Sequence, residues 1–224
     1  MLTCPAERFA EKLVLSAIHE TQFGRAGACR SLAIAWRMPE STYQLAGFDT
    51  TLGSCAIAWG PRGICRVHLP EESRDAVLAR VQRDLPGAVP APPPPHVAHA
   101  IAGIQALLRG EKTDLSDVAL DFTGVPAFHA QVYALARSIP LGSTRTYGEL
   151  ATALGKPGGA RAVGQALGRN PFAPVVPCHR ILAAGGRMGG FSAYGGLSTK
   201  ARLLMLEGAA RAMCVDAWSP VRAR

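Results

Sequence analysis

Cys178 is the residue of this sequence best placed to do chemistry. It ends the segment Asn170–Cys178, in which three prolines bracket two valines, and His179 and Arg180 follow it. Such a segment is stiff and cannot form a central strand, so it would hold a thiol in a fixed position. Neighbouring basic groups favour the thiolate, which is the nucleophile, and imidazole is its usual base. The segment predicts a nucleophilic cysteine, against the alternative of a small buried hydrophobic residue.

His179 adjoins Cys178 in the sequence, but this alone does not bring the two side chains together. In extended chain, neighbouring side chains point to opposite sides, so a tight turn or a bridging water must join the pair. A third group should then orient the imidazole. Residues 121–224 contain four carboxylates, Asp121, Glu149, Glu207 and Asp216. Glu149 belongs to a capping box, so Glu207 is the candidate. The alternative for Glu207 is a solvated residue at a helix end.

Two short helices joined by a glycine-rich turn precede the cysteine segment. Thr146-Tyr147-Gly148-Glu149 matches the S/T-x-x-E capping box and predicts a helix over Tyr147–Leu154. A second helix is expected over Ala160–Leu167, and these proportions are typical of a helix-turn-helix. The second helix carries small residues and one long charged residue in its first turns, Arg161. Its backbone could therefore approach either a DNA surface or another helix, and the residues alone favour neither.

Hydrophobic spacing and turn residues predict the remaining elements. They are two hairpin strands, Ser54–Trp59 and Ile64–Leu69, and five helices, Ala6–His19, Arg74–Leu85, Val97–Arg109, Pro126–Ile139 and Ser198–Glu207. The proline-rich residues 86–95 are expected to be a stiff extended loop.

The charge distribution suits a polyanionic partner. The net charge is +8, and residues 1–120 balance 12 Lys and Arg against 12 Asp and Glu. The whole excess therefore lies in residues 121–224, and nucleic acid is the commonest partner of such a basic module. The alternative is a contribution to solubility alone.

The remaining composition narrows the class of protein. The six cysteines show no C-x-x-C spacing, which indicates reduced thiols. Cys4 and Cys29 have no His partners at usable spacing, so we predict neither a metal nor any other cofactor. No apolar run is long enough to span a bilayer, and Glu7, Arg8, Glu11 and Lys12 interrupt the N-terminal stretch. We expect a soluble cytoplasmic protein without a membrane partner.

Several ordered segments resemble the O6-alkylguanine-DNA alkyltransferases, the methylated-DNA–protein-cysteine methyltransferase family. They are Thr146–Ala151, Ala160–Gly164, Gly168–Pro171, Pro177–Arg180, Gly195–Leu197 and Leu203–Gly208. The resemblance is strong over about residues 120–210, weaker over 46–120 and absent over 1–45. It implies direct repair of DNA: O6-alkylguanine is flipped out of the duplex, and its alkyl group passes irreversibly to Cys178. O4-alkylthymine is an expected secondary substrate, and a monomer is expected.

The resemblance also implies a fold and domain boundaries. An N-terminal α/β domain over 46–120, with a small antiparallel sheet and helices, would be ribonuclease-H-like. An all-α, winged-helix-like domain over 121–212 would carry the helix-turn-helix. Residues 1–45 would be an N-terminal extension and residues 213–224 a C-terminal tail.

The family pattern assigns roles to individual residues of this chain. Cys178 would accept the alkyl group, His179 would take the thiol proton through a water, and Glu207 would orient His179. Asn170 would hold the turn of the helix-turn-helix against the cysteine segment. Tyr147 would bind the guanine ring and press on the neighbouring phosphate.

Further roles concern the base and the DNA. Arg161 would fill the gap that the flipped base leaves. Contact with the minor groove is expected from Ala160, Arg161, Gly164, Arg169 and Tyr147. The backbone at Cys178 and Ile181 would accept from the guanine amino group, and Ser192 would donate to O6.

The loop Phe191–Gly196 departs from the family pattern because it carries two extra residues. Either Phe191 or Tyr194 could therefore line the substrate pocket. Two other classes of function remain as alternatives. A DNA-binding module without chemistry would lack the acceptor cysteine, which is present. A Cys-His hydrolase would need an oxyanion hole, to which nothing in the sequence points.

Overall fold

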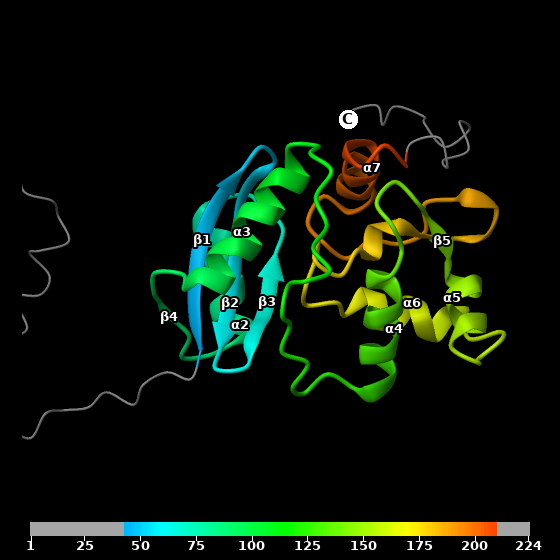
Figure 1. The fold of residues 1–224 in the computed structure, drawn as a ribbon, viewed down its shortest axis with the longest axis horizontal. Coiled ribbons are helices and arrows are strands. Elements are labelled where there is room, and N and C mark those ends of the chain that lie inside the picture. The colour runs from blue at the N-terminus through cyan, green and yellow to red at the C-terminus, as the bar shows by residue number, and fades with distance from the viewer. Residues whose placement is uncertain (1–42, 210–224) are drawn as a thin grey trace, which may run out of the picture. The chain divides into compact units, whose positions relative to one another are not determined.

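A computed structural model of the chain describes residues 43–209, and Figure 1 shows their fold. The predicted helix Ala6–His19 and the predicted tail lie outside these residues. The first half holds a four-stranded sheet of β1 (Gln44–Thr50), β2 (Gly53–Gly60), β3 (Gly63–His68) and β4 (Val89–Pro90), in the order β3-β2-β1-β4. The predicted hairpin is confirmed as β2 and β3, which pair antiparallel around a turn.

Helices cover both faces of this sheet. The helix α2 (Arg74–Asp84) packs on one face through Val77 and Val81, against Ala56, Ala58 and Cys65. The helix α3 (Pro95–Leu108) packs on the other through Val97 and Ile104, in the cluster that holds Ile57 and Trp59. Successive side chains of a strand point to opposite faces, so β2 reads as an almost continuous apolar run because both its faces are buried.

The expectation of a purely antiparallel sheet was wrong. The proline-rich segment, expected to be loop alone, contains β4, which pairs parallel with the start of β1. The Val89 N–H donates to the Tyr43 carbonyl at 3.2 Å, and the Ala91 N–H donates to the Leu45 carbonyl at 3.0 Å. Pro90 between them needs no partner because proline has no N–H, which suits an edge strand. The strand β1 begins at Gln44, before the predicted boundary between residues 45 and 46.

The second half confirms its four predicted helices. They are α4 (Ala127–Arg137), α5 (Tyr147–Ala153), α6 (Ala160–Gly168) and α7 (Gly196–Leu206). The capping box of α5 is formed from both sides, by the Thr146 hydroxyl and the Glu149 carboxylate. The expectation of an all-α second half was wrong. β5 (Arg145–Thr146) and β6 (Ile181–Leu182) pair parallel, because the residues before α5 and those after the cysteine turn both run extended.

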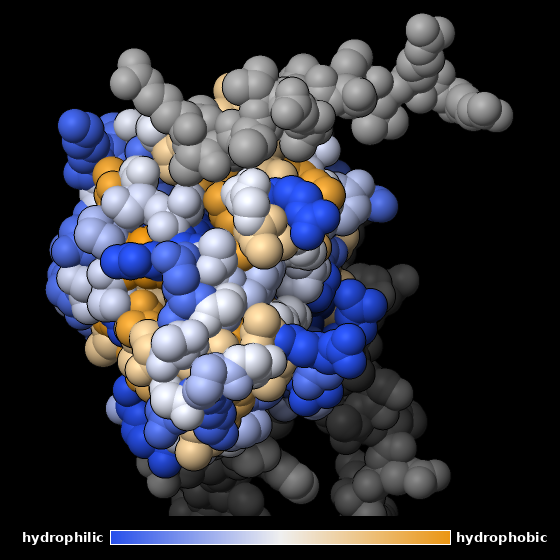
Figure 2. Space-filling view, turned by 90° about the vertical axis from the view of Figure 1, so that its right-hand side faces the viewer, coloured by the Kyte–Doolittle hydropathy of each residue, from blue (hydrophilic) through white to orange (hydrophobic). Residues whose placement is uncertain are grey.

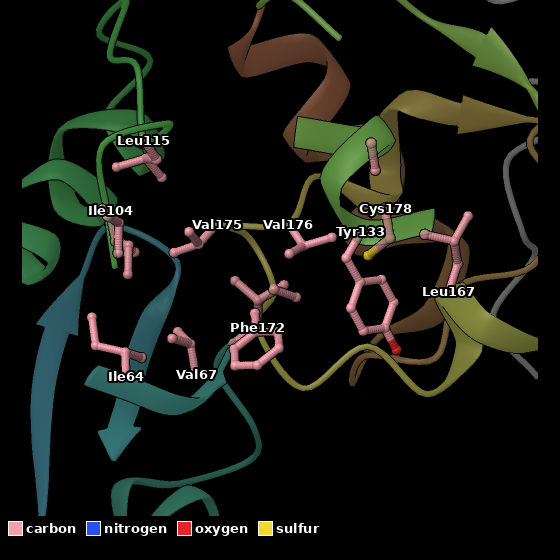
Figure 3. Packing of buried hydrophobic residues seen from close by; sticks show 14 of the residues in the cluster. Ile64, Val67, Ile104, Leu115, Tyr133, Leu167, Phe172, Val175, Val176 and Cys178 are labelled. Carbon is pink, nitrogen blue, oxygen red and sulfur yellow. The ribbon is translucent and has the colours of Figure 1, made fainter. Parts of the chain in front are cut away.

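One hydrophobic cluster runs through both halves (Figure 3). Val67 of β3 lies near Phe172, and the Val67 N–H donates to the Pro171 carbonyl at 2.8 Å. Phe172 makes edge-on contacts with the rings of Phe122 and Tyr133, at centroid distances of 5.3 and 6.2 Å. The cysteine segment therefore packs against the sheet as well as against the helices. Within residues 43–209, no helix combines the length and the apolar character needed to cross a membrane.

Candidate active site and nucleic-acid interface

Cys178 lies at the start of a single 3₁₀ turn, η1 (Cys178–Arg180), and its side chain is almost fully buried. Asn170 holds the chain that leads to this turn. Its Nδ2 donates to the Val176 carbonyl at 2.9 Å, and its Oδ1 accepts from the Phe172 N–H at 3.0 Å. Asn170 follows the end of α6, so it ties the helix-turn-helix to the cysteine segment.

The 3₁₀ turn directs His179 toward the end of α7, where Glu207 is the C-cap residue. His179 Nε2 lies 2.8 Å from Glu207 Oε1, and both side chains are excluded from solvent. Glu207 is thus a buried partner and not a solvated residue at a helix end. His179 Nδ1 is also buried and has no hydrogen-bond partner within residues 43–209.

Arg180 was expected only as a basic neighbour that favours the Cys178 thiolate, but in the structure it binds Glu207. Its Nε donates to Glu207 Oε2 at 2.8 Å and its Nη2 donates to Glu207 Oε1 at 2.9 Å. Its Nη1 donates to the Ile139 carbonyl at 2.6 Å. A planar guanidinium that binds a carboxylate through two donors fixes the carboxylate in orientation as well as position. Arg180 therefore fixes the carboxylate of Glu207, which in turn orients the ring of His179.

Burial and pairing set the resting protonation states. Burial of Glu207 raises its pKa, but hydrogen bonds from His179 and Arg180 outweigh this effect and bring the pKa to about 2. Glu207 is therefore a carboxylate that can only accept, so His179 Nε2 carries the hydrogen between them. Burial lowers the pKa of His179, which leaves its ring neutral and its Nδ1 a free acceptor. Burial raises the pKa of Cys178, so the resting sulfur is a thiol that needs a base.

Lys200 is a second site residue that the sequence did not reveal. This residue of α7 has no exposed surface, and its Nζ donates to the carbonyls of Ile181 at 2.6 Å and Gly190 at 3.4 Å. Burial lowers its pKa to about 8, although the nearby Cys178 sulfur raises it. The same ammonium lowers the pKa of Cys178 and so opposes the effect of burial on the thiol. The Ile181 carbonyl, which was expected to accept a hydrogen bond from the guanine amino group, already accepts one from Lys200.

A cavity of about 640 Å³ opens above the sulfur. The helix-turn-helix lines one side through Tyr147, Ala160 and Gly164, and the lengthened loop lines the other through Phe191 and Ser192. Phe191, and not Tyr194, therefore faces this cavity. Apolar walls with a few polar groups are typical of pockets for flat organic ligands.

Tyr147 closes against the glycines of the opposite loop. Its hydroxyl donates to the Gly190 carbonyl at 3.3 Å. Gly189 has a φ of +64°, and a Cβ atom there would lie 2.9 Å from the Tyr147 ring. Glycine is required at this position for both reasons, because the left-handed region and the close approach each exclude larger residues.

The remaining expected residues lie at the rim. Arg161 is exposed in the first turn of α6 and does not line the cavity. Arg169 is exposed at the C-cap of α6, near the edge of the sheet. Figure 2 shows the side on which α5 and β5 lie: hydrophilic side chains stand around the edges, and residues of weaker hydropathy fill the middle.

Known proteins share both the sequence and the fold. Residues 127–209 match the family model described as 6-O-methylguanine DNA methyltransferase, DNA binding domain. The methylated-DNA–protein-cysteine methyltransferase of Mycolicibacterium paratuberculosis is 46% identical over 110 residues, which cover 49% of this chain and 64% of that protein. The Mycobacterium bovis protein of the same name is 44% identical over 116 residues, 52% of this chain and 68% of that protein.

A solved structure extends the similarity to both halves of the described fold. The crystal structure of Mycobacterium tuberculosis OGT in complex with DNA is 34% identical, with a TM-score of 0.60. It covers 78% of this chain and 96% of that one.

Proposed function

Because this chain belongs to the 6-O-methylguanine DNA methyltransferase family, we propose that it repairs DNA by moving an alkyl group from O6 of guanine to the Cys178 sulfur. The observation that carries this proposal is the position of the Cys178 thiol. Cys178 lies on a rigid turn at the floor of a cavity that a helix-turn-helix lines. A DNA-binding module without chemistry would not need a buried thiol beside a histidine and carboxylate pair.

The transfer needs a thiolate, a base and a leaving group that can depart. His179 takes the thiol proton at Nδ1 through a water molecule, while Glu207 holds the ring and stabilises the charge that it acquires. The sulfur attacks the alkyl carbon, the S–C bond forms and the C–O6 bond breaks. Guanine leaves as a neutral base once it has gained a proton. The product is a thioether, which has no easy reversal, so each molecule acts once.

The DNA must present the base outside its stack, because O6 is unreachable within the duplex. In the proposed complex, α6 lies in the minor groove with Ala160 and Gly164 at the surface, and Arg161 fills the gap left by the base. Tyr147 binds the flipped base, Ser192 donates to O6, and Arg169 contacts a phosphate. O4-alkylthymine is the proposed secondary substrate.

The proposal extends to the fold type of each half, the domain boundary, the oligomeric state and the cellular compartment. The sheet with its two helices is ribonuclease-H-like, and the second half is winged-helix-like with its helix-turn-helix. The domain boundary near residues 120 and 121 separates the two. The protein acts as a monomer in the cytoplasm, where bacterial relatives would meet their DNA.

The proposal is tested by weighing the peptide that contains Cys178 after incubation with a duplex carrying one O6-methylguanine. We expect this peptide to gain one methyl group in place of the thiol hydrogen, and the duplex to lose the same group. A Cys178→Ala variant is the control, and it should bind the duplex without repairing it. An unmodified Cys178 peptide beside repaired or merely bound DNA would contradict the proposal.

Replacing Lys200 with Met should slow methyl transfer at pH 7 by about tenfold, because the ammonium no longer favours the thiolate of Cys178. The rate should recover as the pH rises, since more thiol then ionises without help. The measurement is the single-turnover rate between pH 6 and pH 9. An equal loss at every pH would show that Lys200 serves the fold alone.

A further inference from the structure

A second cavity of about 300 Å³ lies on the other side of the lengthened loop. It shares four lining residues with the first cavity, Gly168, Cys178, Phe191 and Ser192. Ala193 and Tyr194 of the same loop line the second cavity and not the first. The two cavities therefore meet at Cys178, and Ala193 and Tyr194 of the loop form part of the wall of the second.

The sulfur itself is reached from the second side. Asn170 lines the second cavity and not the first, and a hydrogen bond from its side chain lowers the pKa of the Cys178 thiol, against the larger effect of burial. A group bonded to the sulfur, or about to be, therefore has space beyond the base pocket.

The second cavity has an excess of positive charge. Its lining includes three arginines and two carboxylates. Glu71 is paired with Arg80 at 2.8 Å, and Asp84 lies 3.1 Å from His68. Burial lowers the pKa of His68, so this ring adds no charge, and Asp84 remains one uncompensated carboxylate in the lining. Within residues 43–209, Arg66 and Arg169 form no ion pair with a carboxylate, so their charges are available to an anion.

We propose that the second cavity receives O6-alkyl groups that end in a carboxylate, such as carboxymethyl, and that Arg66 of β3 selects for them. The inference rests on the proposed function, because the alkyl carbon must already stand at the Cys178 sulfur. A methyl group does not reach the second cavity. A longer group must extend past the sulfur, and the carboxylate then gains a partner in place of water.

The chemical step is the same for this substrate. The Cys178 sulfur attacks the methylene carbon of the carboxymethyl group, the S–CH₂ bond forms and the CH₂–O6 bond breaks. Guanine keeps the electron pair of the broken bond and gains a proton. The carboxylate passes unchanged to the protein as S-carboxymethylcysteine, so neither an oxidant nor a further reactant is needed.

The test compares three duplexes that carry O6-methylguanine, O6-carboxymethylguanine or O6-isobutylguanine. Isobutyl matches carboxymethyl in its number of heavy atoms and in branching, but it has no charge. Single-turnover rates are measured for the wild-type protein, for Arg66→Gln and for Arg83→Gln. Arg83 is exposed on α2 and does not line the cavity, so its variant loses the same charge at a distance.

We expect Arg66→Gln to lower the ratio of carboxymethyl to isobutyl transfer by about three- to tenfold, the effect of one nearby charge in a partly solvated site. Arg83→Gln should leave the ratio unchanged, and all three proteins should repair O6-methylguanine alike. An equal ratio in wild type and Arg66→Gln, or no carboxymethyl transfer by the wild type, would overturn the inference while the repair function stands. Failure with O6-methylguanine itself would instead refute the proposed function.

Discussion

Replacing Glu207 with Gln is expected to slow methyl transfer by about 100- to 1,000-fold and to lower the free energy of unfolding by about 3–5 kcal/mol. The carboxylate is buried between His179 and Arg180 and binds both. The amide of Gln carries no charge and has one accepting oxygen in place of two. The Arg180 guanidinium therefore loses its charged partner, and the His179 imidazolium loses the charge that stabilises it. Urea unfolding and single-turnover transfer measure the two effects.

The pH dependence of stability separates the charge of Glu207 from its shape. Its pKa in the folded protein is about 2, below the ordinary value of 4.5. A lowered pKa stabilises the fold at pH values above the ordinary one, and this contribution is lost as the pH falls from about 4.5 toward 2. The difference in stability between wild type and Glu207→Gln should therefore be full at pH 7 and shrink on acidification.

Glu149→Gln is the matched control for Glu207→Gln. It also removes one carboxylate from the second half, but Glu149 is exposed, where it completes the capping box of α5 and pairs with Arg145 at 3.7 Å. We expect a loss of at most about 1 kcal/mol and nearly unchanged transfer. The rate at which Cys178 reacts with iodoacetamide in the absence of DNA distinguishes a positioning role from a structural one. If Glu207→Gln lost stability but kept the wild-type rates of transfer and alkylation, the role of Glu207 in the reaction would be refuted.

Replacing Phe172 with Ala should destabilise the whole described fold by about 3–5 kcal/mol, in one cooperative transition. Phe172 has no exposed surface and packs on Phe122 and Tyr133, between β3 and the helical half. The cavity left by its ring would open at the contact between the sheet and the cysteine segment. Urea unfolding followed by circular dichroism and by tryptophan fluorescence measures the change, since Trp59 belongs to the sheet.

Phe128→Ala is the control, because it makes the same substitution at a less buried phenylalanine. Phe128 is only partly buried at the edge of the same cluster, where its ring lies under the Lys156 ammonium at 4.6 Å. Its loss should cost less than half as much. If Phe172→Ala instead gave two separate transitions, with the sheet unaffected, the two halves would be independent folding units and the prediction would be wrong.

Local patterns predicted the helices of the fold, and non-local pairing accounts for what they missed. The capping box at Thr146 and the apolar spacing over Arg74–Leu85 depend on residues a few positions apart, so the sequence displays them. The pairing of Gln44 with Val89 joins residues far apart in the chain, and neither segment carries a strong strand pattern of its own. For this reason β4 was not expected, whereas β1, which pairs locally with β2, was missed because its own residues do not alternate clearly.

Local patterns likewise predicted some residues of the site, and the others depend on contacts between distant parts of the chain. Glu207 could be found because carboxylates are scarce in the second half, and Cys178 and His179 because of the proline-rich segment. Arg180 directly follows His179 in the sequence, but its contact with Glu207 depends on the 3₁₀ turn, which no local pattern predicts. Lys200 carried no signal, because a lysine in a helix is almost always solvated and its burial here depends on the carbonyl groups of Ile181 and Gly190.

The short pairing of β5 with β6 has a consequence for how this protein can vary. Arg145 and Thr146, which lead into α5, pair with Ile181 and Leu182, which follow the cysteine turn. Backbone pairing therefore helps to set the spacing between α5 and the nucleophile, together with the capping box at Thr146 and the burial of Ile181 and Leu182. These contacts hold the base pocket and the sulfur in register without help from the loops around the pocket. The loops around the pocket are then free to diversify, and new lesions can come within reach without a new active site.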